Sequence, residues 1–271
     1  MPELPEVETV VRGLAAHIIG SRIAGIELKR KDLRIPFPKD FAKSVAGVRI
    51  TAISRRAKYL IFTLDNKMSI IAHMGMSGSF SVSKPRKAIT HDHVIFTLDD
   101  GRTLIYNDPR RFGVMTLCKT AELEKHPLLV VLGPEPFSKE FNASYLQAQL
   151  ARRKGAIKPV LMDQKLVVGV GNIYASEALF LAGIDPCKPA SAAVSKASLL
   201  IKCIRKVLAD AIESGGSTLR NFANASGEAG YFQHKFNVYD REGEPCFICG
   251  KEIIAIRQAG RSTFYCKHCQ R

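Results

Sequence analysis

Apolar residues change their spacing twice along the chain. From Val7 to Ile18 they recur every three or four positions, which predicts a helix over about residues 5–19. From Ser21 to Leu117 they form short runs rich in Ile, Val, Phe and Thr, which is typical of strands. Turn-forming residues at 65–67 and 99–101 separate neighbouring runs, so we expect an antiparallel sandwich or barrel. The expected strands cover residues 22–28, 48–53, 59–64, 69–74, 94–98, 103–106 and 114–117.

The strand pattern stops at residues 133–136, Gly-Pro-Glu-Pro, which predicts a linker. Helical spacing follows over residues 142–153, 158–163, 172–182 and 195–214. In the last helix, the residues predicted to face inward are Leu199, Ile201, Ile204, Val207, Leu208 and Ile212. These patterns predict an α+β multidomain chain with three parts. They are an N-terminal β-sandwich domain with an N-terminal helix (1–132), a linker and helical domain with a loop at about 217–234 (133–235), and a small cysteine module (236–271).

The cysteines indicate a metal site at the end of the chain. Four of the seven form two Cys-x-x-Cys pairs with sixteen residues between them, which suits a two-stranded ribbon that holds one zinc ion: Cys246, Cys249, Cys266 and Cys269. Four thiolates close the coordination shell, so the zinc is expected to hold shape and not to activate water. A redox pair is the alternative, although redox motifs use one such pair. The odd total and the scattered Cys118, Cys187 and Cys203 argue against a disulfide framework.

The composition is that of a folded and strongly basic protein. Hydrophobic residues make up 46% of the chain, and 40 Lys+Arg against 25 Asp+Glu leave a formal net charge of +15. Such an excess favours a polyanionic partner, either nucleic acid or an anionic membrane surface, over a basic surface without a partner. No apolar run approaches the roughly 18 residues of a membrane span. No signal-peptide pattern opens the chain, so we expect a cytoplasmic protein.

The first residues are candidates for an amine nucleophile. Because residue 2 is small, Met1 is expected to be removed, which leaves Pro2 with a free secondary amine whose pKa begins near about 8. A neutral amine attacks an aldehyde-like carbon, and the iminium that a secondary amine forms remains an electron sink. Glu3 and Glu6 are candidates to protonate or orient a sugar oxygen. The ordinary alternative is a capped helix start with solvated carboxylates, since Pro and Glu are common there.

Three further stretches suit phosphate binding. A polar turn at residues 258–263 presents Arg261, whose guanidinium suits a bidentate phosphate contact. Two glycines precede Asn172 at a helix start, where backbone N–H groups bind phosphate well. Residues 54–59 place three cations, Lys58 among them, just before an apolar strand. The ordinary alternatives are a solvated turn at residues 258–263, a packing turn before Asn172 and a solvated strand end at residues 54–59.

Two turns carry apolar side chains in a polar setting. Phe112 lies among arginines in residues 108–113, and Met76 lies in a Gly- and Ser-rich loop at residues 73–78. Such side chains suit insertion between stacked bases, with core packing as the alternative. His91-Asp92-His93 suits either a metal, for which no further ligand lies nearby in the sequence, or a phosphate.

Taken together, these stretches resemble the bacterial formamidopyrimidine-DNA glycosylases, the 8-oxoguanine repair enzymes. The resemblance covers essentially the whole chain and shows no departure at a functional position. The matching motifs are Pro2-Glu3-Leu4-Pro5-Glu6-Val7-Glu8, Arg55-Arg56-Ala57-Lys58-Tyr59-Leu60, His73-Met74-Gly75-Met76-Ser77-Gly78, His91-Asp92-His93, Asp108-Pro109-Arg110-Arg111-Phe112-Gly113, Leu132-Gly133-Pro134-Glu135-Pro136, Gly169-Val170-Gly171-Asn172-Ile173-Tyr174 and the four-cysteine finger with Arg261.

This resemblance implies a fold, a partner and a reaction. The fold is a β-sandwich, a helix-two-turn-helix domain and a zinc finger, in a monomer that holds damaged double-stranded DNA between its lobes, in the bacterial cytoplasm at the nucleoid. Oxidised purines would be removed through a Schiff base of Pro2, and the strand would then be cleaved by β,δ-elimination. Glu3 would assist base loss, Lys58 would donate a proton in β-elimination, and Arg261 would act at the phosphate in δ-elimination.

The resemblance also implies DNA contacts. Met76, Arg110 and Phe112 would fill the gap left by the flipped nucleotide. Asn172 would grip the backbone with Arg261, and the loop at about 217–234 would cover the extruded base. Further DNA contacts would come from His73, His91, Arg153 and Lys158.

Two other functions stay open at this point. An endonuclease VIII-like enzyme shares the amine and the helices but prefers oxidised pyrimidines; Leu4 and the set of Met76, Arg110 and Phe112 resemble the purine branch. A non-catalytic nucleic-acid-binding zinc protein would explain the charge and the cysteines. It would leave Pro2 and Glu3 without a reason.

Overall fold

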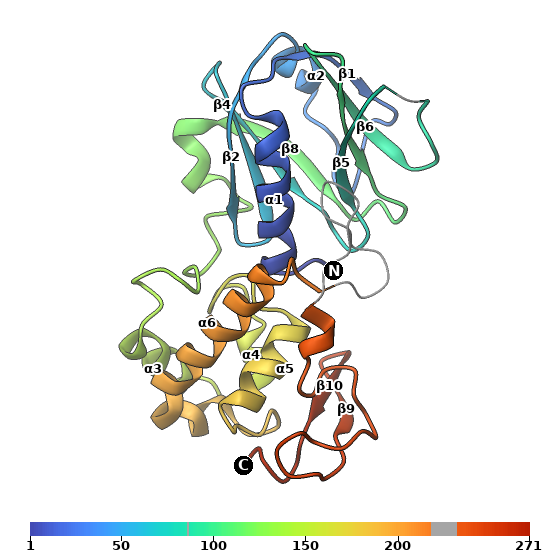
Figure 1. Ribbon diagram of the computed structural model, residues 1–271. Coiled ribbons are helices and arrows are strands. Elements are labelled where there is room, and N and C mark those ends of the chain that lie inside the picture. Colours follow the sequence, from blue (N-terminus) through green and yellow to red (C-terminus); the bar gives the residue numbers. More distant parts are fainter. Residues whose placement is uncertain (86, 218–231) are drawn as a thin grey trace. The chain divides into compact units, whose positions relative to one another are not determined.

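The computed structural model describes residues 1–85, 87–217 and 232–271 (Figure 1). The chain divides into two compact units. The first unit contains Met1–Val130 and, of the described residues, 215–217; the second contains Val131–Ser214 and Phe232–Arg271. The predicted loop at 217–234 lies almost entirely outside the described residues.

The first unit is built on two four-stranded antiparallel sheets, which confirms the predicted sandwich. The strand orders are β1-β6-β7-β5 and β2-β3-β4-β8. One strand, β5, was not predicted, because its polar positions are serines that are equally common in loops. The strands are β1 (Ile23–Leu28), β2 (Ile50–Arg56), β3 (Tyr59–Leu64), β4 (Met68–His73), β5 (Ser79–Ser83), β6 (Asp92–Leu98), β7 (Thr103–Asn107) and β8 (Val114–Lys119).

Helix α1 (Leu4–Ile18) belongs to the core of this unit (Figure 1). Its predicted apolar stripe, from Val7 to Ile18, is buried in one cluster with residues of both sheets. A short helix, α2 (Phe41–Val45), adds Phe41 to the same cluster, and the 3-10 helix η1 (Thr120–Lys125) follows β8. The core therefore places the start of α1 firmly within the sandwich domain.

The second unit contains the predicted helices. Asn142 caps the first of them, since its Oδ1 accepts a hydrogen bond from the Tyr145 backbone N at 3.0 Å. Gly183, at φ +60°, follows the third and allows the chain to turn. The helices are α3 (Ala143–Ala151), α4 (Ile157–Leu161), α5 (Asn172–Leu181) and α6 (Ala197–Glu213), with 3-10 helices η2 (Ala190–Lys196) and η3 (Phe232–Lys235).

One inward position of α6 was predicted wrongly. Ile201, Ile204, Val207 and Leu208 are buried, but Leu199 is 45% exposed. Leu199 precedes Ile204 by five residues, which turns it about 140° away from the centre of the buried stripe. The helix is amphipathic as predicted, but Leu199 lies on its exposed side.

The predicted ribbon at the end of the chain is confirmed. Strands β9 (Ile254–Gln258) and β10 (Arg261–Tyr265) pair antiparallel, with Arg261 opposite Gln258. The ribbon shares a buried cluster with Phe180 of α5. No helix within the described ranges is both long and apolar enough to cross a bilayer.

Candidate functional site

Helix α1 begins two residues after the predicted nucleophile, with Glu3 as its N-cap. Pro2 is half-buried behind an exposed Met1, and Glu3 is buried. Glu6 Oε2 accepts a hydrogen bond from the Glu3 backbone N at 2.8 Å, so the first turn of the helix fixes the backbone next to Pro2. Removal of Met1 leaves the proline nitrogen close to the positive end of the helix dipole, which favours the uncharged amine.

Glu6 also binds a distant part of the first unit. Its Oε1 accepts hydrogen bonds from both the backbone N and the Oγ of Ser217, each at 2.9 Å, and the carboxylate is buried. Gly216 precedes this contact at φ +81°, and a Cβ atom there would lie 3.3 Å from Glu6 Cγ. The sequence did not predict this link, which ties the start of α1 to residues 216–217.

Lys58 lies in the turn between β2 and β3. It is buried and follows Ala57, which has φ +54°. Arg55 braces the turn, because its Nε donates to Glu8 Oε2 at 3.0 Å and its Nη1 to the Ala57 carbonyl at 2.9 Å. Burial opposes ionisation of Glu8, but hydrogen bonds and charges from Arg12 and Arg55 lower its pKa below the ordinary value. The turn that carries Lys58 is therefore fastened to α1.

His73 ends β4 as a neutral imidazole. Burial, followed by the positive charges of Lys58 and Arg34, lowers the pKa of His73 to about 4. Its Nδ1 accepts a hydrogen bond from the Gly75 backbone N at 2.9 Å, and its ring lies 4.9 Å from the Tyr59 ring. Because Nδ1 is an acceptor, the proton resides on Nε2, which is left as a donor.

The two turns with apolar side chains come together. Met76 and Phe112 are each 44% exposed. The Arg110 guanidinium lies over the Phe112 ring, with its carbon 4.8 Å from the ring centroid. At Gly75 a Cβ atom would lie only 2.5 Å from the Phe112 carbonyl carbon, so the backbones of the two loops touch. The three residues predicted to replace a flipped nucleotide thus occupy one exposed surface.

The His91-Asp92-His93 motif forms no metal site. His91 is exposed at φ +73°, whereas His93 is buried with its Nε2 2.9 Å from the Asp108 carbonyl oxygen. Asp92 Oδ2 accepts from the Ile89 backbone N at 2.9 Å. Among the described residues, potential metal ligands cluster only at the four cysteines. Of the two alternatives, an exposed His91 fits a phosphate contact.

The second unit gathers Asn172 and Arg261. Arg261 opens β10 after a turn in which Ala259 and Gly260 have φ +47° and +76°. Asn172 Nδ2 donates to the Ser262 carbonyl at 3.0 Å. Both side chains line a cavity of about 240 Å³ whose other polar walls are Lys158, Asp163, Gln258 and Thr263. The helix start and the ribbon turn therefore face one hollow.

Two other predicted DNA contacts, Lys158 and Arg153, are buried or half-buried in the second unit. Lys158 is 1% exposed, and its Nζ donates to the Ser262 carbonyl and to Thr263 Oγ1, each at 2.8 Å. Arg153 is half-buried, with its Nη2 3.6 Å from Asp163 Oδ2. The structure thus gives both cations partners inside the second unit, which the sequence did not predict.

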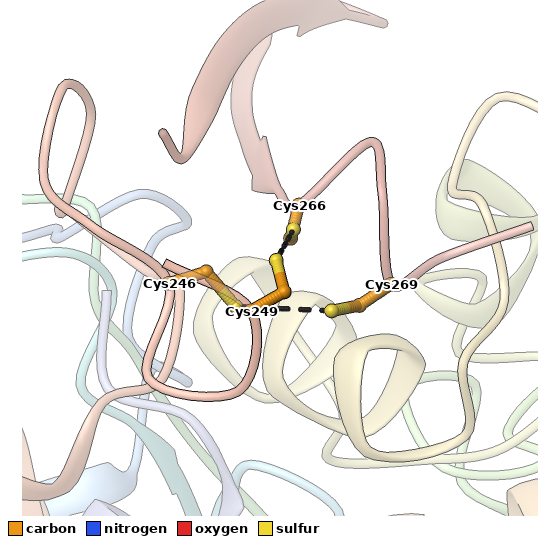
Figure 2. A group of neighbouring side chains, drawn as sticks. All are labelled: Cys246, Cys249, Cys266 and Cys269. Carbon is orange, nitrogen blue, oxygen red and sulfur yellow. Dashed lines mark hydrogen bonds between the residues drawn. The ribbon is translucent and has the colours of Figure 1, made fainter. Parts of the chain in front are cut away.

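The four cysteines converge as a zinc site requires (Figure 2). Their Sγ atoms all lie within 4.8 Å of one another, which suits tetrahedral coordination by four thiolates. Burial opposes ionisation of Cys246, but hydrogen bonds from the backbone of Cys249 and Ile248 and from neighbouring thiols lower its pKa to about 7, whereas burial raises the pKa of Cys266 and of Cys269. The backbone donors stabilise a metal-bound thiolate at Cys246, and the convergence of the four Sγ atoms fits the ion.

Domain comparisons match most of the chain. The formamidopyrimidine-DNA glycosylase N-terminal domain matches residues 1–115, the formamidopyrimidine-DNA glycosylase H2TH domain matches 132–223, and the zinc finger found in FPG and IleRS matches 243–271. The four-cysteine cluster lies within the last match, so the finger binds one structural zinc ion.

Whole-chain comparisons agree. The formamidopyrimidine-DNA glycosylases of Ruegeria pomeroyi and Rhizobium meliloti are each 48% identical to this chain, with 100% of both chains covered. A mutant Lactococcus lactis FPG, solved with a Fapy-dG containing DNA, gives a TM-score of 0.93 at 37% identity over 100% of both chains. The MutM (FPG) protein of Thermus thermophilus gives 0.90 at 38% identity, over 99% of this chain and 98% of that one. With matches along its full length, this chain belongs to the formamidopyrimidine-DNA glycosylase family, the DNA glycosylases of base-excision repair.

Proposed function

We propose that this chain removes oxidised purines, 8-oxoguanine and formamidopyrimidines, from duplex DNA and then cleaves the strand at the abasic site. The observation that carries the proposal is the position of Pro2 next to Glu3, the N-cap of α1, whose backbone N donates a hydrogen bond to Glu6. The solved Lactococcus lactis FPG complexes contain Fapy-dG in one case and an abasic site in another. These complexes support DNA that carries a formamidopyrimidine or an abasic site as the substrate of this chain.

The chemistry begins at the Pro2 nitrogen once Met1 is removed. The neutral amine attacks C1′ of the damaged nucleotide, the base leaves, and the sugar ring opens to an iminium. Glu3 protonates the departing group or the ring oxygen. Water then removes a C2′ proton, the electron pair of that C–H bond flows into the iminium, and the resulting enamine expels the 3′ phosphate, which Lys58 protonates as it leaves. A second elimination follows, in which water removes the C4′ proton and the bond between C5′ and the 5′ phosphate breaks, with Arg261 at that phosphate.

The remaining site residues bind DNA in this proposal. Met76, Arg110 and Phe112 fill the gap that the extruded nucleotide leaves. His73 donates from Nε2 as a neutral group, while Asn172 and Arg261 bind backbone phosphate. His91 and Arg153 complete the set, whereas the enclosed Lys158 supports the turn that presents Arg261. The net charge of +15 supports this assignment, because phosphate neutralisation gives DNA affinity that falls steeply with salt.

We also propose that the protein acts in the bacterial cytoplasm, because chromosomal DNA is its substrate. We further propose that it acts as a monomer. The proposed domain boundaries are 1–132, 133–235 and 236–271. The loop within residues 217–234 is proposed to cover the extruded base.

Oxidised pyrimidines are the second substrate class to test. One Lactococcus lactis FPG complex contains an oxidized pyrimidine in its DNA, at 37% identity to this chain. Membership of a glycosylase family argues against the third alternative, a zinc protein that binds nucleic acid without catalysis.

Borohydride trapping tests the proposal directly. The mature protein is mixed with duplexes that carry 8-oxoguanine opposite cytosine, a formamidopyrimidine, or an oxidised pyrimidine, and the iminium is reduced. We expect a covalent protein–DNA adduct with the purine lesions at higher yield than with the pyrimidine. The reverse order of yields would favour the endonuclease VIII-like function.

The matched control is the same chain with Met1 retained. Blocking the Pro2 nitrogen should abolish the adduct, whereas Glu3→Gln should still trap a preformed abasic site because base loss is already complete. An adduct that survives N-terminal blockage would move the nucleophile to a lysine such as Lys58.

A further inference from the structure

Asp108 is a fully buried carboxylate between the two loops with exposed apolar side chains. Its exposed fraction is 0%. Residues 74–78 follow β4 and carry Met76, and residues 108–113 follow β7 and carry Arg110 and Phe112. None of the roles assigned above uses this carboxylate, although both loops surround it.

All four hydrogen-bonding positions of Asp108 are occupied by groups of these loops and the adjoining strand. Its Oδ1 accepts from Ser77 Oγ at 2.8 Å and from the Arg110 backbone N at 3.2 Å. Its Oδ2 accepts from the Gly113 backbone N at 2.8 Å and from the Tyr106 hydroxyl at 3.1 Å. A carboxylate offers about four lone-pair sites, so Asp108 is saturated. Ser77 belongs to the Met76 loop, whereas Arg110 and Gly113 flank Phe112 in the other.

Close packing fixes the register of the two loops. Gly75, at φ +65°, has the Phe112 carbonyl carbon 2.5 Å from where a Cβ would lie. A Cβ at Gly113 would lie 1.8 Å from the Tyr106 hydroxyl oxygen, and one at Gly78 would lie 2.4 Å from it. Burial and the Asp108 charge raise the pKa of Tyr106, so its hydroxyl stays a donor to the carboxylate. Sliding one loop past the other would break these contacts.

We propose that Asp108 is a positioning residue that locks Met76, Arg110 and Phe112 into one preformed wedge. The inference rests on the proposed function, in which these side chains enter the base stack. Unstacking a base step costs a few kcal/mol, and ordering two loose loops would add to that cost. By holding both loops in advance, the carboxylate lowers the barrier to nucleotide extrusion without touching DNA.

The proposal predicts which reaction step depends on Asp108. Extrusion of a stacked, paired base needs the wedge, so base excision should be sensitive. A preformed abasic site has no base to unstack, so strand cleavage there should depend on Pro2 chemistry and little on the wedge. A purely structural role of Asp108 would lower both activities together.

Asp108→Asn is the main test variant, because it keeps the shape and removes the charge. In either orientation of the new amide, its NH₂ group faces the backbone N–H of Arg110 or of Gly113. Both groups are donors, so that hydrogen bond is lost. We expect excision of 8-oxoguanine to fall by about 30-fold, on the scale of a lost hydrogen bond to a charged group. Cleavage at a preformed abasic site should fall by no more than about threefold. Ser77→Ala removes one bond of four, so it should lower excision by about threefold and leave abasic cleavage unchanged.

A double-mutant cycle separates positioning from general damage. In the Met76→Ala/Phe112→Ala background, which lacks the apolar wedge, Asp108→Asn should cost less than about twofold in excision. The proposal would be overturned if Asp108→Asn lowered excision as much in this background as in the wild type. It would also be overturned if Asp108→Asn lowered 8-oxoguanine excision and abasic-site cleavage equally. If Asp108→Asn does not fold, the same cycle is run with Ser77→Ala. Wild-type protein that cleaved neither substrate would instead reject the proposed function.

Discussion

Lys158 and Thr263 are joined by a buried hydrogen bond, from Nζ to Oγ1 at 2.8 Å. Lys158 lies in α4 and Thr263 in β10, two residues after Arg261. The same ammonium donates to the Ser262 carbonyl at 2.8 Å. Thr263 Oγ1 in turn donates a hydrogen bond to Gln258 Oε1 at 2.9 Å. The helix therefore holds the base of the turn that presents Arg261.

Lys158→Met should loosen this turn. The variant keeps most of the buried volume but leaves two acceptors without their charged donor, so Arg261 becomes less ordered. We expect δ-elimination at a preformed abasic site to slow by about tenfold, measured as the ratio of δ- to β-elimination products on a gel.

Thr263 supplies the matched pair for that prediction. Thr263→Val removes the hydroxyl, so its ratio of δ- to β-elimination products should fall as it does in Lys158→Met. Thr263→Ser keeps the hydroxyl, so its product ratio should equal that of the wild type. If all three variants gave the wild-type product ratio, the link would have no bearing on Arg261.

Zinc removal should weaken DNA binding by loosening the ribbon that carries Arg261. The ribbon that carries Arg261 shares its buried cluster with Cys246 and Cys266, and four-thiolate zinc sites supply about 10 kcal/mol or more to the folding of small modules. Chelation should release about one zinc ion per chain and weaken binding to abasic DNA by at least about tenfold. Fluorescence anisotropy measures the affinity, and recovery on zinc addition is the control. Unchanged affinity after complete metal loss would contradict the prediction.

Glu177 offers a test of stability in the second unit. Its buried carboxylate accepts from the backbone N of Asn237, Val238 and Tyr239 at 2.9, 3.0 and 2.9 Å. Glu177→Gln places an amide donor against backbone donors, so the free energy of unfolding should fall by about 2–4 kcal/mol. Urea denaturation measures the loss. The exposed Glu213→Gln on α6 is the control and should change stability by less than about 0.5 kcal/mol.

The sequence predicted elements and ligands whose signal lies in residue spacing. The 3.6-residue period locates α1, and the paired spacing of Cys246 and Cys249 locates half of the zinc site. The sequence did not predict the roles of Asp108 and Glu177, because backbone N–H groups supply two of the bonds described for Asp108 and most of those described for Glu177. Such donors leave no trace in the partner's residue type. The family resemblance implied a DNA contact for Lys158, but only tertiary packing shows that its ammonium is enclosed. A lone carboxylate within an apolar helix, as at Glu177, is the one signal that could have drawn notice.

His73 predicts an acid-sensitive stability with a defined window. Its pKa is about 4 in the folded protein and 6.5 for the ordinary side chain. Above pH of about 6.5 neither state is protonated, and the full stability is present. As the pH falls toward 4, the unfolded chain binds a proton that the folded chain refuses, so stability drops by about 2–3 kcal/mol. Below that pH both states are protonated and this contribution stays constant.

His73→Asn isolates this contribution, because the Asn side chain carries no titratable group and its Oδ1 can accept from the Gly75 backbone N in place of Nδ1. Urea unfolding of both proteins should be compared between pH 4 and 7.5. The difference in unfolding free energy should be steady above pH of about 6.5 and then shift in favour of the variant as the pH falls. Parallel curves across the range would show that His73 is protonated equally in both states, which would contradict the neutral imidazole in the folded protein.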